Sequence, residues 1–228
     1  MALILNIDTA LDTACISLAE NGRLLQSATN ENQKDHAIWT HNAISKLIQG
    51  SESAIGNLNA IGVSIGPGSY TGLRIGLSSA KGLCYALKIP LITINTLEMM
   101  TVSAIKDREI AFPDLLAEIL LFCPMIDARR MEVFTAVYDL NLNEVIKPQA
   151  LILDKNSFED ILMRQKILFW GNGSLKFQKV CQNPHAIFKK MPLNAFALAT
   201  LTYRNFIGNN FADLAYTEPL YLKEFFTK

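Results

Sequence analysis

A glycine-rich run, GPGSYTGLRIGLSSAKGLCYAL, begins at Gly66 and directly follows an apolar segment at 58–65. Small residues recur in it at every fourth position: Gly68, Gly72, Gly76, Ala80 and Cys84. Residues four apart share one side of a helix, so the pattern predicts a helix with one side almost free of side chains. Each glycine costs about 1 kcal/mol of helix propensity, so we expect a close backbone contact to compensate. The spacing leaves open whether the contacting helix belongs to this chain or to another subunit.

The same run excludes two common phosphate-binding motifs. Gly72 is followed by Leu73, without the lysine of a G-x-x-x-x-G-K-[ST] loop, and the glycine spacing does not match G-x-G-x-x-G. A generic anion pocket stays open, because Ser69 or Thr71 can cap the helix while its first N–H groups point outward. A tight strand-to-helix turn without a ligand is equally compatible with the sequence.

The elements predicted around this run follow the order of one α/β unit. Segments 3–8 and 13–20 are apolar or alternating, and Asn21-Gly22 marks a hairpin into 23–29, so three strands open the chain. A helix at 35–48 and a strand at 58–65 come next. The glycine-rich helix, a strand at 91–95 and a helix at 96–106 with Thr96 as its N-cap follow. We therefore expect 1–106 to form one unit.

A second unit is predicted at 107–228, because the chain turns polar at 107–109 and is punctuated by Pro113. Its elements repeat the earlier order. Three strands are predicted at 118–127, 131–138 and 144–152, followed by a helix at 156–164, a strand at 167–170, a turn at 171–173 and a helix at 174–181. A closing helix at 193–207 and an extended tail at 218–223 complete the chain. We expect the segment 193–228 to pack back on the first unit.

Charge and composition exclude several classes of function. The chain has 21 Lys+Arg against 21 Asp+Glu, which argues against a dedicated nucleic-acid binder. Its charged fraction of 18% is low and favours a partly apolar outer surface, hence a partner. No window approaches the roughly 20 apolar residues of a membrane span. Four separated cysteines without a C-x-x-C pair suit buried thiols in a reducing cytosol.

Candidate ligand-binding residues are few. His36 and His41 lie five apart, hence about 140° apart on a helix, whereas zinc-binding pairs lie four apart, so no metal site is expected. Asp8 ends the first strand and can face a nucleotide phosphate or its magnesium ion, or hydrogen-bond the following turn. Arg129 and Arg130, at a predicted hairpin tip, can bind an anion or a partner carboxylate, or remain solvated.

Six segments occur in a defined order: ILNIDTALDTACISLAENGRL, a helix opened by His36, AIGVSIGPGSYTGLRIGLSSAKGLCYALKIPLITINTLE, MIDARRMEVFTAVY, WGNG and EPLYLK. Together they resemble the blocks of the bacterial TsaB (YeaZ) family, and GPGSYTGLRIG is the most specific of them. The resemblance covers nearly the whole chain. It implies an α/β fold of two ribonuclease-H-like lobes, each a mixed sheet flanked by helices, in the ASKHA class of actin, Hsp70 and sugar kinases.

The resemblance implies a non-catalytic subunit, a paralogue of the catalytic subunit TsaD that binds and activates it, joined by the ATPase TsaE. The complex transfers a threonylcarbamoyl group to N6 of the adenosine next to the anticodon in tRNAs reading codons that begin with A. A cytoplasmic location is implied. The chain alone is expected to bind no cofactor, and ATP or ADP is expected only at a junction between subunits. It is expected to contact tRNA only as part of the complex. The isolated chain is expected to form a homodimer. The alternative is a stand-alone ATPase or a metallopeptidase.

Two groups of site residues are expected. The interface with TsaD, or with a second copy, is placed on two helices, at His36, Trp39, Ala43, Lys46, Gly72, Arg74, Gly76 and Ala80. A vestigial nucleotide or anion loop is placed at Asp8, Thr9, Gly66, Gly68, Ser69 and Thr71. Ala10 stands where active members of the fold have the glycine of D-x-G, and a Cβ there crowds a phosphate. The H-x-x-x-H metal pair of TsaD is likewise absent, which favours a silent site.

Overall fold

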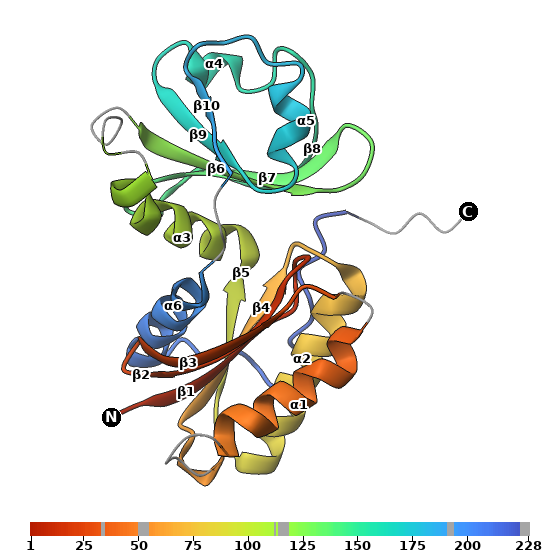
Figure 1. Ribbon diagram of the computed structural model, residues 1–228, viewed down its shortest axis with the longest axis vertical. Helices are drawn as coiled ribbons and strands as arrows, with labels where there is room; N and C mark the ends of the chain where they lie inside the picture. The colour runs from red at the N-terminus through yellow and green to blue at the C-terminus, as the bar shows by residue number, and fades with distance from the viewer. Residues whose placement is uncertain (33–34, 50–54, 112, 114–118, 191–193, 224–228) are drawn as a thin grey trace. The chain divides into compact units, whose positions relative to one another are not determined.

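The computed structural model describes residues 1–32, 35–49, 55–111, 113, 119–190 and 194–223 (Figure 1). The chain divides into two compact units: unit 1 contains Met1–Met99 and Asn194–Leu220, and unit 2 contains Met100–Leu193 and Tyr221–Lys228. The boundary lies inside helix α3 (Thr96–Ala111), earlier than the one predicted after residue 106. The polar run at 107–109 therefore continues the helix instead of linking two units.

Unit 1 is built on a five-stranded mixed sheet in the order β3–β2–β1–β4–β5. The strands are β1 Leu3–Asp8, β2 Ala14–Glu20, β3 Arg23–Asn30, β4 Ala60–Gly66 and β5 Leu91–Asn95. Strand β1 pairs antiparallel with β2 and parallel with β4, and all six of its residues are buried. A strand buried on both sides is mostly apolar, as Leu3, Ile4, Leu5 and Ile7 are here, and its two polar residues, Asn6 and Asp8, accept buried hydrogen bonds from Thr202 and Ser64.

Helices cover both sides of this sheet (Figure 1). Helices α1 (His36–Gln49) and α2 (Tyr70–Leu87) lie side by side on one side, and α6 (Ala195–Ile207) lies on the other. Alternation along β4 separates the two sides. A Cβ on Gly62 would overlap Thr202 of α6, whereas the neighbouring Val63 lies 3.6 Å from the Cβ position of Gly76 in α2. A short 3-10 helix, η2 (Ile55–Asn57), precedes β4.

Unit 2 has a second five-stranded sheet, in the order β10–β9–β6–β7–β8. Its strands are β6 Ile119–Asp127, β7 Glu132–Asp139, β8 Glu144–Ile152, β9 Lys166–Trp170 and β10 Ala186–Phe188, and its short helices are α4 Glu159–Leu162 and α5 Ser174–Gln178. Four phenylalanines stack or meet edge to face in its core, with ring centroids 5.0–5.7 Å apart: Phe158, Phe169, Phe177 and Phe188. They hold α5 against the sheet.

The two sheets have the same topology. Each begins with an antiparallel meander of three strands, and each continues with two strands parallel to the first, so β1 and β6 are central in their sheets. This confirms the predicted repetition of the topology. The two units share this architecture, although their sequences show no evident repeat.

Several predicted elements differ in extent. Helix α4 has four residues where 156–164 was expected, because Asp154 accepts hydrogen bonds from Asn156 N and Ser157 Oγ and so forms a turn there. Strand β10 was not predicted, since three residues carry too little pattern. The cap of α3 is Asn95, whose Oδ1 accepts from Leu97 N at 2.8 Å, in place of Thr96. The predicted starts at 118 and 193 lie outside the described residues.

Candidate functional site

The small-residue side of α2 faces the β1–β2 loop of the same unit. Ser69 N donates to Ala10 O at 2.7 Å, and Thr9 Oγ1 donates to Gly72 O at 2.6 Å. A Cβ on Gly68 or Gly72 would overlap the carbonyl oxygen of Ala10 or of Thr9, and one on Gly76 would overlap Thr9 Oγ1. The close backbone contact predicted for this stripe therefore exists. It is made by a loop of the same chain, whereas a helix was expected.

The predicted anion loop is closed on itself by these contacts. Ser69 caps α2, since its Oγ accepts from Gly72 N at 3.3 Å, which confirms one of the two predicted caps. Thr71 lies exposed on α2. Gly66 has φ +117°, and a Cβ there would lie 2.7 Å from Leu220 O, so only glycine fits beside the C-terminal segment. With Ser69 N already bonded to Ala10, the loop offers a tight turn and no anion cradle in this conformation.

Asp8 is buried beneath the loop. Its Oδ1 accepts from Ser64 Oγ at 2.5 Å and from Ala10 N at 3.0 Å, the turn-bonding role that the sequence left open. Its Oδ2 is buried and has no hydrogen-bond partner among the described residues, and the same holds for Nε2 of His36, the first residue of α1. Burial raises the pKa of Asp8, although Ser64, Ala10 N and the nearby His36 each act to lower it. Burial and the charge of Asp8 raise the pKa of Cys15 to about 12.

The predicted interface residues need correction. Five of the eight are buried inside unit 1: His36, Ala43, Gly72, Gly76 and Ala80. Trp39 is half-buried against the core, and Lys46 and Arg74 are exposed. The small side of α2 packs inward because the β1–β2 loop and sheet need that close approach. A partner helix therefore cannot reach this stripe without opening the unit.

A different side of the two helices faces outward. We define the outer face as the exposed residues Ala37, Ile38, His41 and Ser45 of α1 and Thr71, Arg74, Ser78, Gly82 and Tyr85 of α2. Ile38 and Tyr85 are 72% and 80% exposed, and a Cβ on Gly82 would meet no described atom within 4 Å beyond its chain neighbours and the adjacent backbone of α2. The signal for this face was in the sequence. Thr71, Ser78 and Gly82 recur at helical spacing on another side of α2 than the small residues at every fourth position from Gly68, on which the interface prediction was based.

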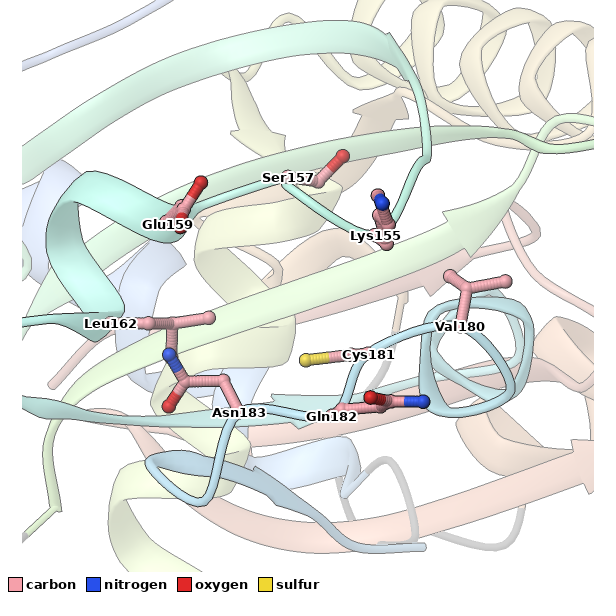
Figure 2. A pocket seen from close by; sticks show the side chains of 8 residues that line it. All are labelled: Lys155, Ser157, Glu159, Leu162, Val180, Cys181, Gln182 and Asn183. Carbon is pink, nitrogen blue, oxygen red and sulfur yellow. The ribbon is translucent and has the colours of Figure 1, made fainter.

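A polar hollow lies in unit 2, with a volume of about 400 Å³ (Figure 2). It is lined by Lys155, Ser157, Glu159, Leu162, Val180, Cys181, Gln182 and Asn183. The Cys181 thiol points into it, while Ser157 Oγ is bonded to Asp154 and Asn183 Oδ1 accepts from His185 N. None of its polar side chains is fully buried, so the lining does not point to a particular ligand or reaction.

Among the described residues, no group of three or more His, Cys, Asp and Glu side chains is arranged to hold a metal ion. His36 is buried and His41 is exposed, so the two histidines point to different sides of α1, as their spacing predicted. No helix in the described part of the chain is long and apolar enough to cross a membrane.

Two units with duplicated mixed sheets define an α/β protein of the two-lobed ASKHA-like class. Two solved structures share this fold over nearly their whole length. An uncharacterised protein with similarity to peptidase YeaZ from Pseudomonas aeruginosa has a TM-score of 0.84 at 20% identity, covering 98% of this chain and 100% of that one. YeaZ from Pseudomonas aeruginosa has a TM-score of 0.81 at 21% identity, covering 97% and 100%.

Sequence comparison defines the family. The family described as "TsaD: tRNA N6-adenosine threonylcarbamoyltransferase" matches residues 24–218. The tRNA threonylcarbamoyladenosine biosynthesis protein TsaB of Bacillus subtilis is 33% identical over 153 residues, 66% of this chain but only 62% of that protein. TsaB of Buchnera aphidicola subsp. Baizongia pistaciae is 26% identical over 232 residues, 97% of this chain and 98% of that protein. The chain belongs to this TsaD-related family and, within it, to the TsaB (YeaZ) family.

Proposed function

We propose that this chain is a non-catalytic, cytoplasmic subunit in the biosynthesis of tRNA threonylcarbamoyladenosine, and that it acts by binding a TsaD partner. The names of its TsaB relatives and the matching TsaD family support the pathway. TsaE joins the pair, and ATP or ADP is bound by the assembly instead of by this chain alone. The chain's work is to hold TsaD in a productive arrangement.

The observation that carries the proposal is the outer face of α1 and α2. Ile38 and Tyr85 hold their side chains largely in solvent on this face, where a partner can bury them. On α2 the exposed small residues Ser78 and Gly82 let another helix approach closely. A TsaD partner, built on the same fold, can present equivalent helices to this face. In the isolated chain a second copy can cover the same surface by two-fold symmetry.

The loop between β1 and β2 supports a silent site. A phosphate-binding loop needs free N–H groups and room for the anion. Here Ser69 N is bonded to Ala10 O, and the backbone of Thr9 and Ala10 occupies the space in front of Gly68 and Gly72. Buried Asp8, with a raised pKa and its bonded oxygen turned to Ser64, is poorly suited to hold a magnesium ion.

The test introduces one arginine at either of two open glycines. Gly82→Arg adds a long charged side chain to the outer face, and Gly56→Arg adds the same side chain in η2, where a Cβ also meets no atom within 4 Å. Each variant is co-expressed with TsaD from the same organism, and complex formation is measured by size exclusion with light scattering. We expect the parent and Gly56→Arg to form the heterodimer, and Gly82→Arg to lose it at least tenfold.

A second readout follows function. A mixture of TsaD, TsaE, tRNA and threonylcarbamoyl-adenylate should yield modified nucleoside, measured by mass spectrometry, only when this chain is added. Undiminished binding by Gly82→Arg would remove the outer face as the interface. Unchanged product without this chain would remove the scaffold function itself.

A further inference from the structure

Three loops of unit 2 meet at one edge of its sheet. Strands β6, β9 and β10 are parallel, so their carboxyl ends lie at the same edge. Pro124 pairs with Trp170, and Lys189 N donates to Phe169 O at 3.2 Å, which aligns the ends of the three strands. In open α/β sheets, ligands characteristically bind at the carboxyl edge. We call this the carboxyl edge of unit 2 (Figure 1).

Basic residues follow the strands at this edge. Arg129 and Arg130 come after β6, Lys176 lies on α5 after β9, and Lys189 and Lys190 come after β10. No Asp or Glu occurs in the sequence between Asp160 and Asp213, so the loops after β9 and β10 contain no acid.

The acidic residues of this part of the edge are already neutralised. Asp127 Oδ1 lies 2.6 Å from Lys176 Nζ, and Glu132 Oε2 lies 2.6 Å from Lys223 Nζ. Farther along, beyond β7, Asp154 follows β8 and is bonded within its own turn, next to Lys155. The carboxyl edge therefore carries a local positive charge in a chain whose net charge is zero.

The Arg129-Arg130 turn is built against backbone preference. Both arginines lie in the connection between β6 and β7 with φ of +72° and +47°, in the left-handed region that Asn and Gly adopt more readily than arginine. Asp127 Oδ1 accepts from Arg129 N at 2.6 Å, and Glu132 N donates to Arg129 O at 3.0 Å, which holds the turn. Both arginine side chains are exposed and, among the described residues, neither guanidinium has a hydrogen-bond or ion-pair partner. A backbone conformation that is unfavourable for arginine, at two arginines whose guanidinium groups are exposed, indicates that these side chains bind a ligand.

We propose that the carboxyl edge of unit 2 binds the phosphate backbone of RNA, as the contact this chain makes to tRNA within its complex. The inference rests on the proposed function, since the tRNA is the polyanion of that pathway. The charges are spread across three strands, about 10 Å at the usual strand spacing. Such an arrangement fits a distributed polyanion better than a single carboxylate, and arginine can bind phosphate through two parallel hydrogen bonds. The neutral chain should bind RNA weakly alone and add its contacts to those of TsaD.

The test removes the two arginines without weakening the turn. Arg129→Asn/Arg130→Gly places at both positions a residue that adopts positive φ more readily than arginine, so we expect the fold to be retained. The control, Arg164→Gln/Lys179→Gln, removes two exposed charges just before β9 and at the end of α5, at the amino ends of the strands. Each protein is first assembled with TsaD, and binding of an unmodified transcript of a tRNA reading an A-starting codon is followed by fluorescence anisotropy over a salt series.

We expect the slope of log K against log salt to fall by about 2 for the turn variant, about one for each lost phosphate contact, and to stay unchanged for the control. Equal slopes and affinities for parent and turn variant would overturn the proposal, as would a parent complex that does not bind the transcript. Loss of TsaD binding by the turn variant would also overturn it, because the edge would then contact protein. If the parent itself fails to assemble with TsaD, the proposed function fails before any RNA is added.

Discussion

Ser64 Oγ donates a 2.5 Å hydrogen bond to Asp8 Oδ1, which joins the middle of β4 to the end of β1 inside unit 1. The same oxygen accepts from Ala10 N, and this bond shapes the β1–β2 loop that fills the space in front of α2. Oδ2 is buried, and no residue that the structure describes donates a hydrogen bond to it. Asp8 is therefore a structural carboxyl that sets the conformation of the loop.

Replacing Asp8 by Asn tests the cost of its buried charge. Burial raises the folded-state pKa above the ordinary 3.8, so the folded chain binds the proton more tightly than the unfolded chain. The stability that Asp8 contributes is complete below the unfolded pKa and is lost as pH rises through the folded one. We expect Asp8→Asn to unfold at higher urea concentration than the parent at pH 8, with a gap that narrows toward about pH 4. A variant less stable than the parent at pH 8 would mean that the ionised carboxylate stabilises unit 1.

Two glycines of α2 should respond in opposite directions to alanine. A Cβ on Gly72 overlaps Thr9 O, so Gly72→Ala should lower the free energy of unfolding by about 1–3 kcal/mol. Gly82 has open space, so Gly82→Ala should raise it by up to about 1 kcal/mol through helix propensity. Urea denaturation followed by circular dichroism measures both. Equal effects would contradict the close contact with the β1–β2 loop.

The contact between α6 and the sheet depends on one buried hydroxyl. Thr202 Oγ1 donates to Asn6 Oδ1 at 2.6 Å, and both side chains are fully buried. Thr202→Val keeps the volume but leaves Asn6 without this donor, so we expect a loss of about 1–3 kcal/mol in the free energy of unfolding. Thr202→Ser keeps the donor and serves as the control. The idea fails if Val is tolerated better than Ser.

The start of α3 allows a paired test of helix capping. Asn95 Oδ1 accepts from Leu97 N, so Asn95→Ala should cost about 1 kcal/mol. Thr96 Oγ1 is buried and has no hydrogen-bond partner in the described part of the chain, so we expect Thr96→Val to unfold no more easily than the parent. Thermal unfolding of the two variants distinguishes the caps. A larger loss for Thr96→Val would restore Thr96 as the cap.

Much of the fold could be predicted because local pattern and packing agree. The mostly apolar segment Leu3–Asp8 suits a buried strand, Asn21-Gly22 suits a hairpin turn, and the spacing of small residues around Gly72 suits a closely packed helix. All three elements were found. Elements with little pattern were missed or misjudged: β10 has only three residues, and α4 is cut short by the Asp154 turn. Chain polarity also misled the boundary, since the polar run that was interpreted as the start of a second unit continues α3.

The sequence by itself determined the duplicated α/β topology, the spacing of small residues on α2 and the divergence of His36 and His41, because these follow from residue order and helix geometry. Only the tertiary structure decided what the small residues touch. A helix side that is nearly free of side chains can pack against any backbone, and the loop at Thr9 lies closer than any second helix. For the same reason the outer face, with Ile38 and Tyr85, could be identified only from the structure, which shows that the β1–β2 loop covers the opposite side of α2.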